Sequence, residues 1–92
     1  MNMTPKVRQQ LKAQAHRLNP TVMIGNQGLT DAVKKEIDRA LNDHELIKIK
    51  IAGQDRELRQ QLVAEIVSAA QAELIQLIGH ICVVYRKNPE KN

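Results

Sequence analysis

A four-residue stretch, Gly25-Asn26-Gln27-Gly28, has the residue types and spacing best suited to binding a ligand. The β-branched run 21–24 precedes it, and the amphipathic stretch that opens at Leu29 follows it. A strand that breaks at a glycine and meets a second glycine at a helix start leaves backbone N–H groups exposed in front of the helix dipole. Such a GxxG loop suits a phosphate and can clamp a nucleic-acid backbone. Turns also need glycine, so the context of the loop must decide.

The distribution of charge supplies part of that context. The net charge is +4, but residues 1–35 hold six bases and one acid, whereas residues 36–72 hold five bases and seven acids. No acid occurs among the first thirty residues. The flanking residues predicted to neutralise phosphates are Arg8, Lys12, His16 and Arg17 before the loop and Lys34, Lys35 and Arg39 after it. Solubility alone would not concentrate charge around one loop, so we favour a polyanion as the partner.

Catalytic and metal chemistry find little support in the sequence. The three histidines, His16, His44 and His80, are far apart and no cysteine pair accompanies them, so a zinc site is not expected. The only serine, Ser68, has no base placed to activate it, and the carboxylates are scattered. We therefore expect no enzyme, no cofactor and no small-molecule substrate.

The residue types also bear on compartment and on the mode of binding. The single cysteine, Cys82, excludes an internal disulfide, and no signal peptide or membrane span is expected, so a cytoplasmic location is predicted. The chain has one Tyr and no Phe or Trp, too few rings for the base-stacking platforms of RRM or OB domains. No helix rich in Arg, Asn and Gln is present to read DNA bases. Recognition of folded RNA through its backbone and shape is what remains.

Three helices are predicted to carry these residues. The first starts at Thr4-Pro5, an N-cap followed by proline, and ends at Asn19-Pro20, with Val7, Leu11, Ala15 and Leu18 on its apolar face. The second spans roughly 30–42, breaks at Asp43-His44 and buries Leu29, Val33, Ile37 and Leu41. The third spans about 55–72, and its apolar stripe is Leu58, Leu62, Ile66 and Ala69, widened by Val63 and Val67.

Four strands complete the predicted fold. They cover 21–24, 46–51, 74–78 and 81–85, and Gly79-His80 joins the last two as a type II′ hairpin. In 46–51 the isoleucines share one face, and Lys48 and Lys50 share the other. The order α-β-α-β-α-β-β predicts an α/β fold in which parallel pairs and a final antiparallel hairpin form one mixed four-stranded sheet packed with helices. Residues 1–88 are expected to form a single, monomeric domain and 89–92 a frayed tail.

Several motifs in combination carry a family resemblance. They are Thr4-Pro5-Lys6, the run 11–16 (LKAQAH), the GNQG loop with Leu29-Thr30, the run 44–48 (HELIK) and the closing run 83–86 (VVYR). Together they resemble bacterial single-domain members of the CRM (chloroplast RNA splicing and ribosome maturation) family. The resemblance implies a fold similar to the C-terminal domain of translation initiation factor three and binding to RNA of large-subunit ribosome precursors. Many members carry a lysine inside the loop, where this chain has Asn26 and Gln27. Without a lysine in the loop, backbone amides and the neighbouring helices are left to bind the RNA.

Two hypotheses follow from these observations. The first is an RNA-binding accessory factor that docks on structured ribosomal RNA during large-subunit assembly, with the glycine loop near the backbone and the flanking bases on phosphates. The second is a small protein-interaction module that uses a sheet edge or the Lys48/Lys50 face and binds no RNA.

Overall fold

Seven elements follow one another in the predicted order, α-β-α-β-α-β-β. The computed structural model describes residues 3–53 and 55–88, and the tail predicted for 89–92 lies outside them. The elements are α1 (Pro5–Ala15), β1 (Val22–Ile24), α2 (Asp31–His44), β2 (Leu46–Ile51), α3 (Arg56–Ala70), β3 (Glu73–Ile78) and β4 (Ile81–Tyr85). The predicted α/β class is confirmed.

The four strands form one mixed sheet in the order β1-β2-β4-β3. β1 and β2 are parallel, and β4 pairs antiparallel with both β2 and β3. The β2-α3-β3 unit therefore does bring its two strands into the same direction, as a strand–helix–strand unit should. They are not neighbours, however, because β4 folds back and inserts between them.

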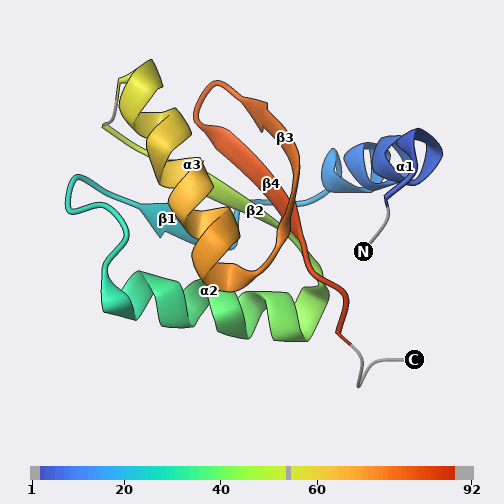
Figure 1. The fold of residues 1–92 in the computed structure, drawn as a ribbon, viewed down its shortest axis with the longest axis horizontal. Coiled ribbons are helices and arrows are strands. Elements are labelled where there is room, and N and C mark those ends of the chain that lie inside the picture. Colours follow the sequence, from blue (N-terminus) through green and yellow to red (C-terminus); the bar gives the residue numbers. More distant parts are fainter. Residues whose placement is uncertain (1–2, 54, 89–92) are drawn as a thin grey trace.

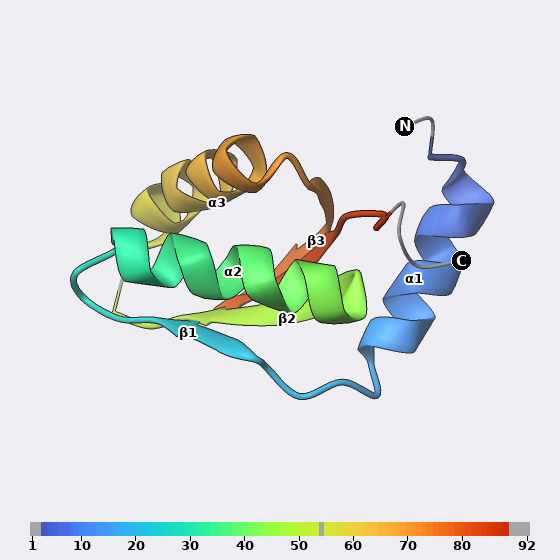
Figure 2. The same ribbon diagram turned by 90° about the horizontal axis from the view of Figure 1, so that it is seen from below.

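One face of the sheet is covered by α2 and α3 (Figures 1 and 2). The alternation in β2 puts Ile47, Ile49 and Ile51 on this inner face, where each is at most 1% exposed. Both helices contribute to the same buried cluster, and β4 adds Cys82 and Val84. Burial raises the pKa of the Cys82 thiol to about 12, so Cys82 behaves as a small core hydrophobe.

The outer face of the sheet is covered only in part, by α1. Leu11 and Ala15 of α1 pack with Leu46, Ile75 and Val83 in a second, smaller buried cluster, and Tyr85 lies against it. Burial raises the pKa of the Tyr85 hydroxyl, and the nearby Glu45 carboxylate adds to the shift. The face of the sheet that carries Lys48 and Lys50, as the alternation predicts, is therefore also the face on which α1 packs.

Each helix begins at a side-chain cap. Thr4, Thr30 and Asp55 each accept a hydrogen bond from the amide three residues on, at 3.1, 3.2 and 2.8 Å. The predicted Thr4-Pro5 helix start is confirmed, since Thr4 is the cap and Pro5 opens α1.

The predicted end of α1 is wrong. The helix stops at Ala15 and not at Asn19-Pro20, because the following amides of Arg17 and Leu18 bond to carbonyls three residues back, which tightens and ends the last turn. Leu18 thus leaves the apolar face and is 37% exposed, and Val7 at the other end is 41% exposed.

The ends of α2 and α3 also differ from prediction. α2 continues through the expected break at Asp43-His44 and ends at His44, and its C-cap, Glu45, has a φ of 65°. Contacts remote in sequence hold that residue: its carbonyl accepts from the Arg86 amide and its carboxylate from the Asn88 amide. α3 ends at Ala70, where Gln71 adopts the left-handed conformation.

The apolar stripe of α3 is rotated relative to the prediction. Leu62, Val63 and Ile66 are buried, whereas Leu58 is 47% exposed and Ala69 is exposed. At 100° per residue, Leu58 and Ala69 fall at the margin of a stripe centred on Val63 and Ile66. The hairpin prediction fits: Ile78 pairs with Ile81, and Gly79 has a φ of +55°.

Candidate nucleic-acid interface

The GNQG loop is a closed turn at the end of β1. The Gly25 carbonyl accepts a hydrogen bond from the Gly28 amide at 3.1 Å, and the Gly28 carbonyl accepts one from Thr30 at 3.1 Å. Gly28 has a φ of +74°, which only glycine adopts readily. The sequence predicts that the backbone amides of this loop are exposed and free to bind a ligand. In the structure fewer of them are free, because the Gly28 and Thr30 amides donate hydrogen bonds within the turn.

The two glycines of the loop serve different purposes. At Gly25 no atom lies within 4 Å of the position that a Cβ would take, and the residue is exposed with an ordinary φ. Neither backbone conformation nor packing therefore demands glycine at position 25. A glycine there does leave the main chain open to a ligand, whereas Gly28 is required by the turn itself.

The side chain of Asn26 points toward the segment after β2 and not into solvent. Its Oδ1 occupies the space in which Gly53, in the segment after β2, would carry a Cβ. The Ala52 amide also donates to the Ile24 carbonyl at 2.8 Å, so the two loops brace each other. Gly53 has a φ of +75° and belongs to this site, although sequence reasoning did not select it. Its position directly after a strand was the available signal.

α2 begins after the GNQG loop and α3 after residues 52–53, and the two helix starts lie apart in Figure 1. β1 and β2 are parallel, so their carboxyl ends lie at one edge of the sheet, and α2 and α3 both begin there, at the left in both views (Figures 1 and 2). We call this region the loop end; it comprises residues 25–35, 52–53 and 55–59. Its bases include Arg56 and Arg59, which sequence reasoning missed, and its acids are Asp31, Asp55 and Glu57. The loop end thus combines helix dipoles with a near balance of charge.

The three predicted bases of α2 do not share one side of that helix. Lys34 lines a shallow hollow against α3, together with Glu65 and Ser68. Arg39 lines a hollow on the opposite side, next to Thr21 and Val22 of the β1 edge. Lys35 is exposed and lies one turn before Arg39.

The bases predicted in and after α1 lie at the other end of the molecule. In both views α1 is at the right and the loop between β1 and α2 is at the left, along a longest axis of 36 Å (Figures 1 and 2). We call α1 with residues 16–20 the α1 end. The predicted site residues are therefore neighbours in sequence but form two separate groups in space. A single small anion cannot contact both groups.

Arg8 has a structural role that the sequence did not reveal. β3 is an edge strand of the sheet and carries a bulge between Leu74 and Gln76. The Arg8 Nη1 donates to the Leu74 carbonyl and, at 3.5 Å, to that of Ile75. Arg8 therefore fastens α1 to the sheet. Lys12 is half-buried, Arg17 is exposed, and His16 lines a hollow of about 180 Å³ with Lys48.

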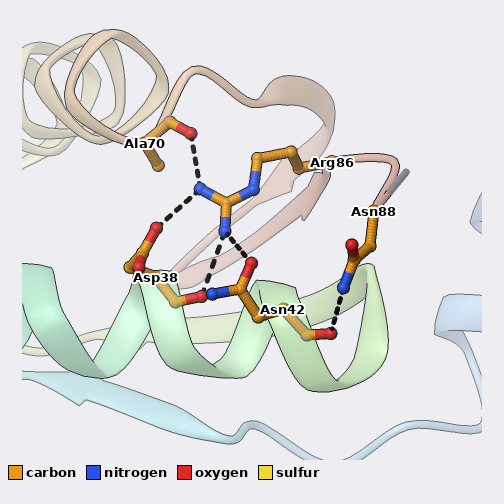
Figure 3. A network of polar contacts seen from close by, with 5 residues as sticks. All are labelled: Asp38, Asn42, Ala70, Arg86 and Asn88. Atoms are coloured by element: carbon orange, nitrogen blue, oxygen red, sulfur yellow. Dashed lines mark hydrogen bonds and ion pairs between the residues drawn. The ribbon is translucent and has the colours of Figure 1, made fainter. Parts of the chain in front are cut away.

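Arg86, in the segment after β4, is held by contacts within the protein. Its guanidinium donates to the Asp38 carboxylate at 2.9 Å, the Asn42 side chain at 2.9 Å and the Ala70 carbonyl at 2.9 Å (Figure 3). Asn88 adds a bond to the Asn42 carbonyl at 2.8 Å. These contacts join the C-terminal ends of α2 and α3 to the segment after β4. The Arg86 charge therefore stabilises the fold.

Within residues 3–53 and 55–88, no group of three His, Cys, Asp or Glu side chains is arranged to hold a metal ion. No described helix is long and apolar enough to cross a membrane.

Comparison with known proteins decides the family. The family model for the CRS1 / YhbY (CRM) domain matches residues 3–86. The chain belongs to the CRM family. This confirms the family assignment that the sequence motifs predicted.

The similarity extends over nearly the whole chain. An RNA-binding protein of Haemophilus influenzae is 51% identical, with 96% of this chain and 89% of the relative covered. A probable RNA-binding protein of Pseudomonas aeruginosa is 42% identical, covering 100% and 88%. The solution structure of a Staphylococcus aureus protein, described as a candidate RNA-binding protein, superposes with a TM-score of 0.84 at 31% identity, over 99% of this chain and 95% of that one. These CRM relatives are named for RNA binding and not for catalysis.

Proposed function

We propose that this CRM protein is a non-catalytic accessory factor that binds structured RNA, with ribosomal RNA of large-subunit precursors as the target and the cytoplasm as its location. The observation that carries the proposal is family membership over residues 3–86 together with relatives named for RNA binding. The acid-free basic segment from residue 3 to residue 30 supports it independently.

The two groups of predicted site residues take different roles in this proposal. At the α1 end, Lys12, His16 and Arg17 neutralise phosphates. At the loop end, Gly25 lets the RNA backbone approach the main chain, and Lys34, Lys35 and Arg56 surround it. Because the groups lie apart along a 36 Å axis, the RNA must be extended and structured enough to span them.

Affinity measured against salt tests the electrostatic part. Each phosphate neutralised by Lys or Arg releases counterions, and the logarithm of affinity then falls by roughly 0.7–0.9 per contact for each unit of log salt. The measurement uses a fragment of precursor large-subunit RNA and the full chain. A slope near zero would contradict phosphate binding.

A second candidate function has one specific observation in its favour. On the outer face, Met23, Lys50, Ile81 and Ile78 form one row across all four strands, and Met23 and Ile78 are 61% and 62% exposed. Exposed apolar side chains beside a lysine would suit a protein partner.

Sedimentation of a cell extract with and without RNase separates the two functions. Co-migration with ribosomal precursors that RNase abolishes supports RNA binding. Association with a soluble protein that resists RNase supports the interaction module, and the RNA proposal then fails.

A further inference from the structure

A hollow of about 370 Å³ lies between the two helix ends that face each other across the start of β2. The end of α1, the link from α1 to β1, the last residue of α2 and the first residues of β2 surround it. That link can be followed in Figure 2, where it passes from α1 beneath the sheet edge to β1. Neither the GNQG loop nor the basic residues of the proposed function line this hollow.

The lining has an apolar part and a polar part. Leu18, Leu46 and Ile47 supply the apolar surface. The polar groups are the side-chain amides of Gln14 and Asn19, the Thr21 hydroxyl and the His44 imidazole. Within the described residues, none of these four side chains has a hydrogen-bond partner, so their donors and acceptors are available to a ligand.

The charge of the lining argues against a phosphate as the occupant. None of the described residues that line the hollow is Asp, Glu, Lys or Arg. A nucleobase, in contrast, is flat and largely apolar on its faces and presents both donors and acceptors along its edge. Side-chain amides pair well with such edges, and an imidazole can stack on a base face. The volume is at the small end of the range for ligand pockets, which fits one base rather than several.

The surroundings provide a path for the rest of the nucleotide strand. On one side, Arg17 is the chain neighbour of Leu18 and is exposed. On the other side, a second hollow of about 310 Å³ shares Thr21 and His44 with the first and reaches Arg39. Glu36 and Asp43 also line that second hollow. Carboxylates repel phosphates but can accept a hydrogen bond from a ribose 2′-hydroxyl.

We infer that the hollow between the ends of α1 and α2 receives one unstacked nucleobase of the bound RNA. The inference rests on the proposed RNA-binding function and deepens it, since it adds a base-contacting site to backbone recognition. It also changes the expectation drawn from the scarcity of aromatic residues: a platform of rings is absent from the sequence, but a single-base pocket does not need one.

The test compares two RNA hairpins that differ only in one bulged nucleotide. With the native chain we expect the bulged hairpin to bind about tenfold more tightly, the scale of one well-paired base edge. The double variant Gln14→Ala with Asn19→Ala should bring the two affinities together while leaving the affinity for the fully paired hairpin and its salt dependence unchanged. The matched control, Gln9→Ala with Gln10→Ala, removes two amides from exposed positions of α1 outside the hollow and should keep the preference.

Each outcome decides something. Equal binding of both hairpins by the native chain, or an intact preference in the Gln14/Asn19 variant, overturns the base pocket and leaves RNA binding standing. Failure to bind either hairpin removes the proposed function and the inference with it. Titration of the native chain with the four nucleoside monophosphates gives a second readout: the Gln14 and Asn19 side-chain NH₂ resonances should shift, and shifts confined to basic residues would contradict the assignment.

Discussion

The two ends of the molecule offer RNA different chemistry. The loop end has an open glycine backbone and two helix starts, but its four bases, Lys34, Lys35, Arg56 and Arg59, are accompanied by three acids, Asp31, Asp55 and Glu57. The α1 end has Lys6, Arg8, Lys12 and Arg17 and no acid. Attraction of a polyanion is therefore expected from the α1 end, and close geometric approach from the loop end.

This difference shows that the acid-free basic segment and the glycine turn occupy separate regions of the molecule. In sequence they look like one motif with basic flanks. In space they are held apart by the length of the sheet, and α1 is joined to that sheet by a small cluster and by Arg8. The following four experiments test the two ends and the inner core separately.

The largest effect on binding is expected from neutralising the α1 end. The double variant Lys12→Gln with Arg17→Gln should lower RNA affinity roughly 10- to 100-fold at low salt and reduce the salt slope by about 2, because two phosphate contacts are lost. Filter binding over a salt series measures both quantities. The control Gln9→Glu with Gln10→Glu changes the net charge equally at the same end of the molecule. An equal loss in the control would mean that overall charge, and not local contact, drives binding.

The second largest effect is expected from removing Arg8, whose guanidinium fastens α1 to β3. Arg8→Ala should loosen α1 at a cost of about 2 kcal/mol, the scale of hydrogen bonds from a charged group. Amide hydrogen exchange at Leu11 and Ala15 should accelerate while exchange at Ile37 and Leu41 in α2 stays slow. Tyr85 is the only aromatic residue and packs against the α1 cluster, so its fluorescence reports the same event. Lys6→Ala, an exposed base on the same helix, is the control, and equal loosening by it would contradict the role of Arg8.

A bulkier residue at Gly25 tests the loop end. Gly25→Val should weaken RNA binding about 5- to 10-fold with an unchanged salt slope, because it obstructs approach without removing charge. The position is open and has an ordinary φ, so the melting temperature should not fall. Gly25→Ala should have a smaller effect in the same direction. Full affinity of the valine variant would show that the loop is only a turn.

The smallest effect is expected at Cys82 in the inner core, whose labelling rate should not respond to a change at the α1 end. Burial holds its pKa at about 12 instead of 9.0, so the native thiol should label far more slowly than the unfolded chain at pH 8. Because the folded pKa is the higher one, the stability from this thiol is complete below pH 9 and is lost as pH rises toward 12. Arg8→Ala should leave the labelling rate unchanged. Faster labelling would mean that α1 and the inner core unfold together.

Much of the fold could be predicted because it depends on local patterns. The Thr4-Pro5 cap, the alternation in Leu46–Ile51 and the Gly79-His80 hairpin each depend on a few adjacent residues, and all three are present in the structure. The helix ends could not be predicted as well. The C-cap of α2, Glu45, depends on Arg86 and Asn88, some forty residues away, and no local signal encodes that contact.

The candidate site shows the same division. The sequence by itself determined the residue types: a glycine loop, an acid-free basic segment, too few rings for a stacking platform, and motifs that identify the CRM family. Only the tertiary structure decided which of these residues meet. It separated Lys12 and Arg17 from the loop, assigned Arg8 and Arg86 to the fold, and brought Gln14 and His44 to one hollow. The physical reason is that patterns of adjacent residues fix each helix and strand, whereas packing between elements fixes where their side chains converge.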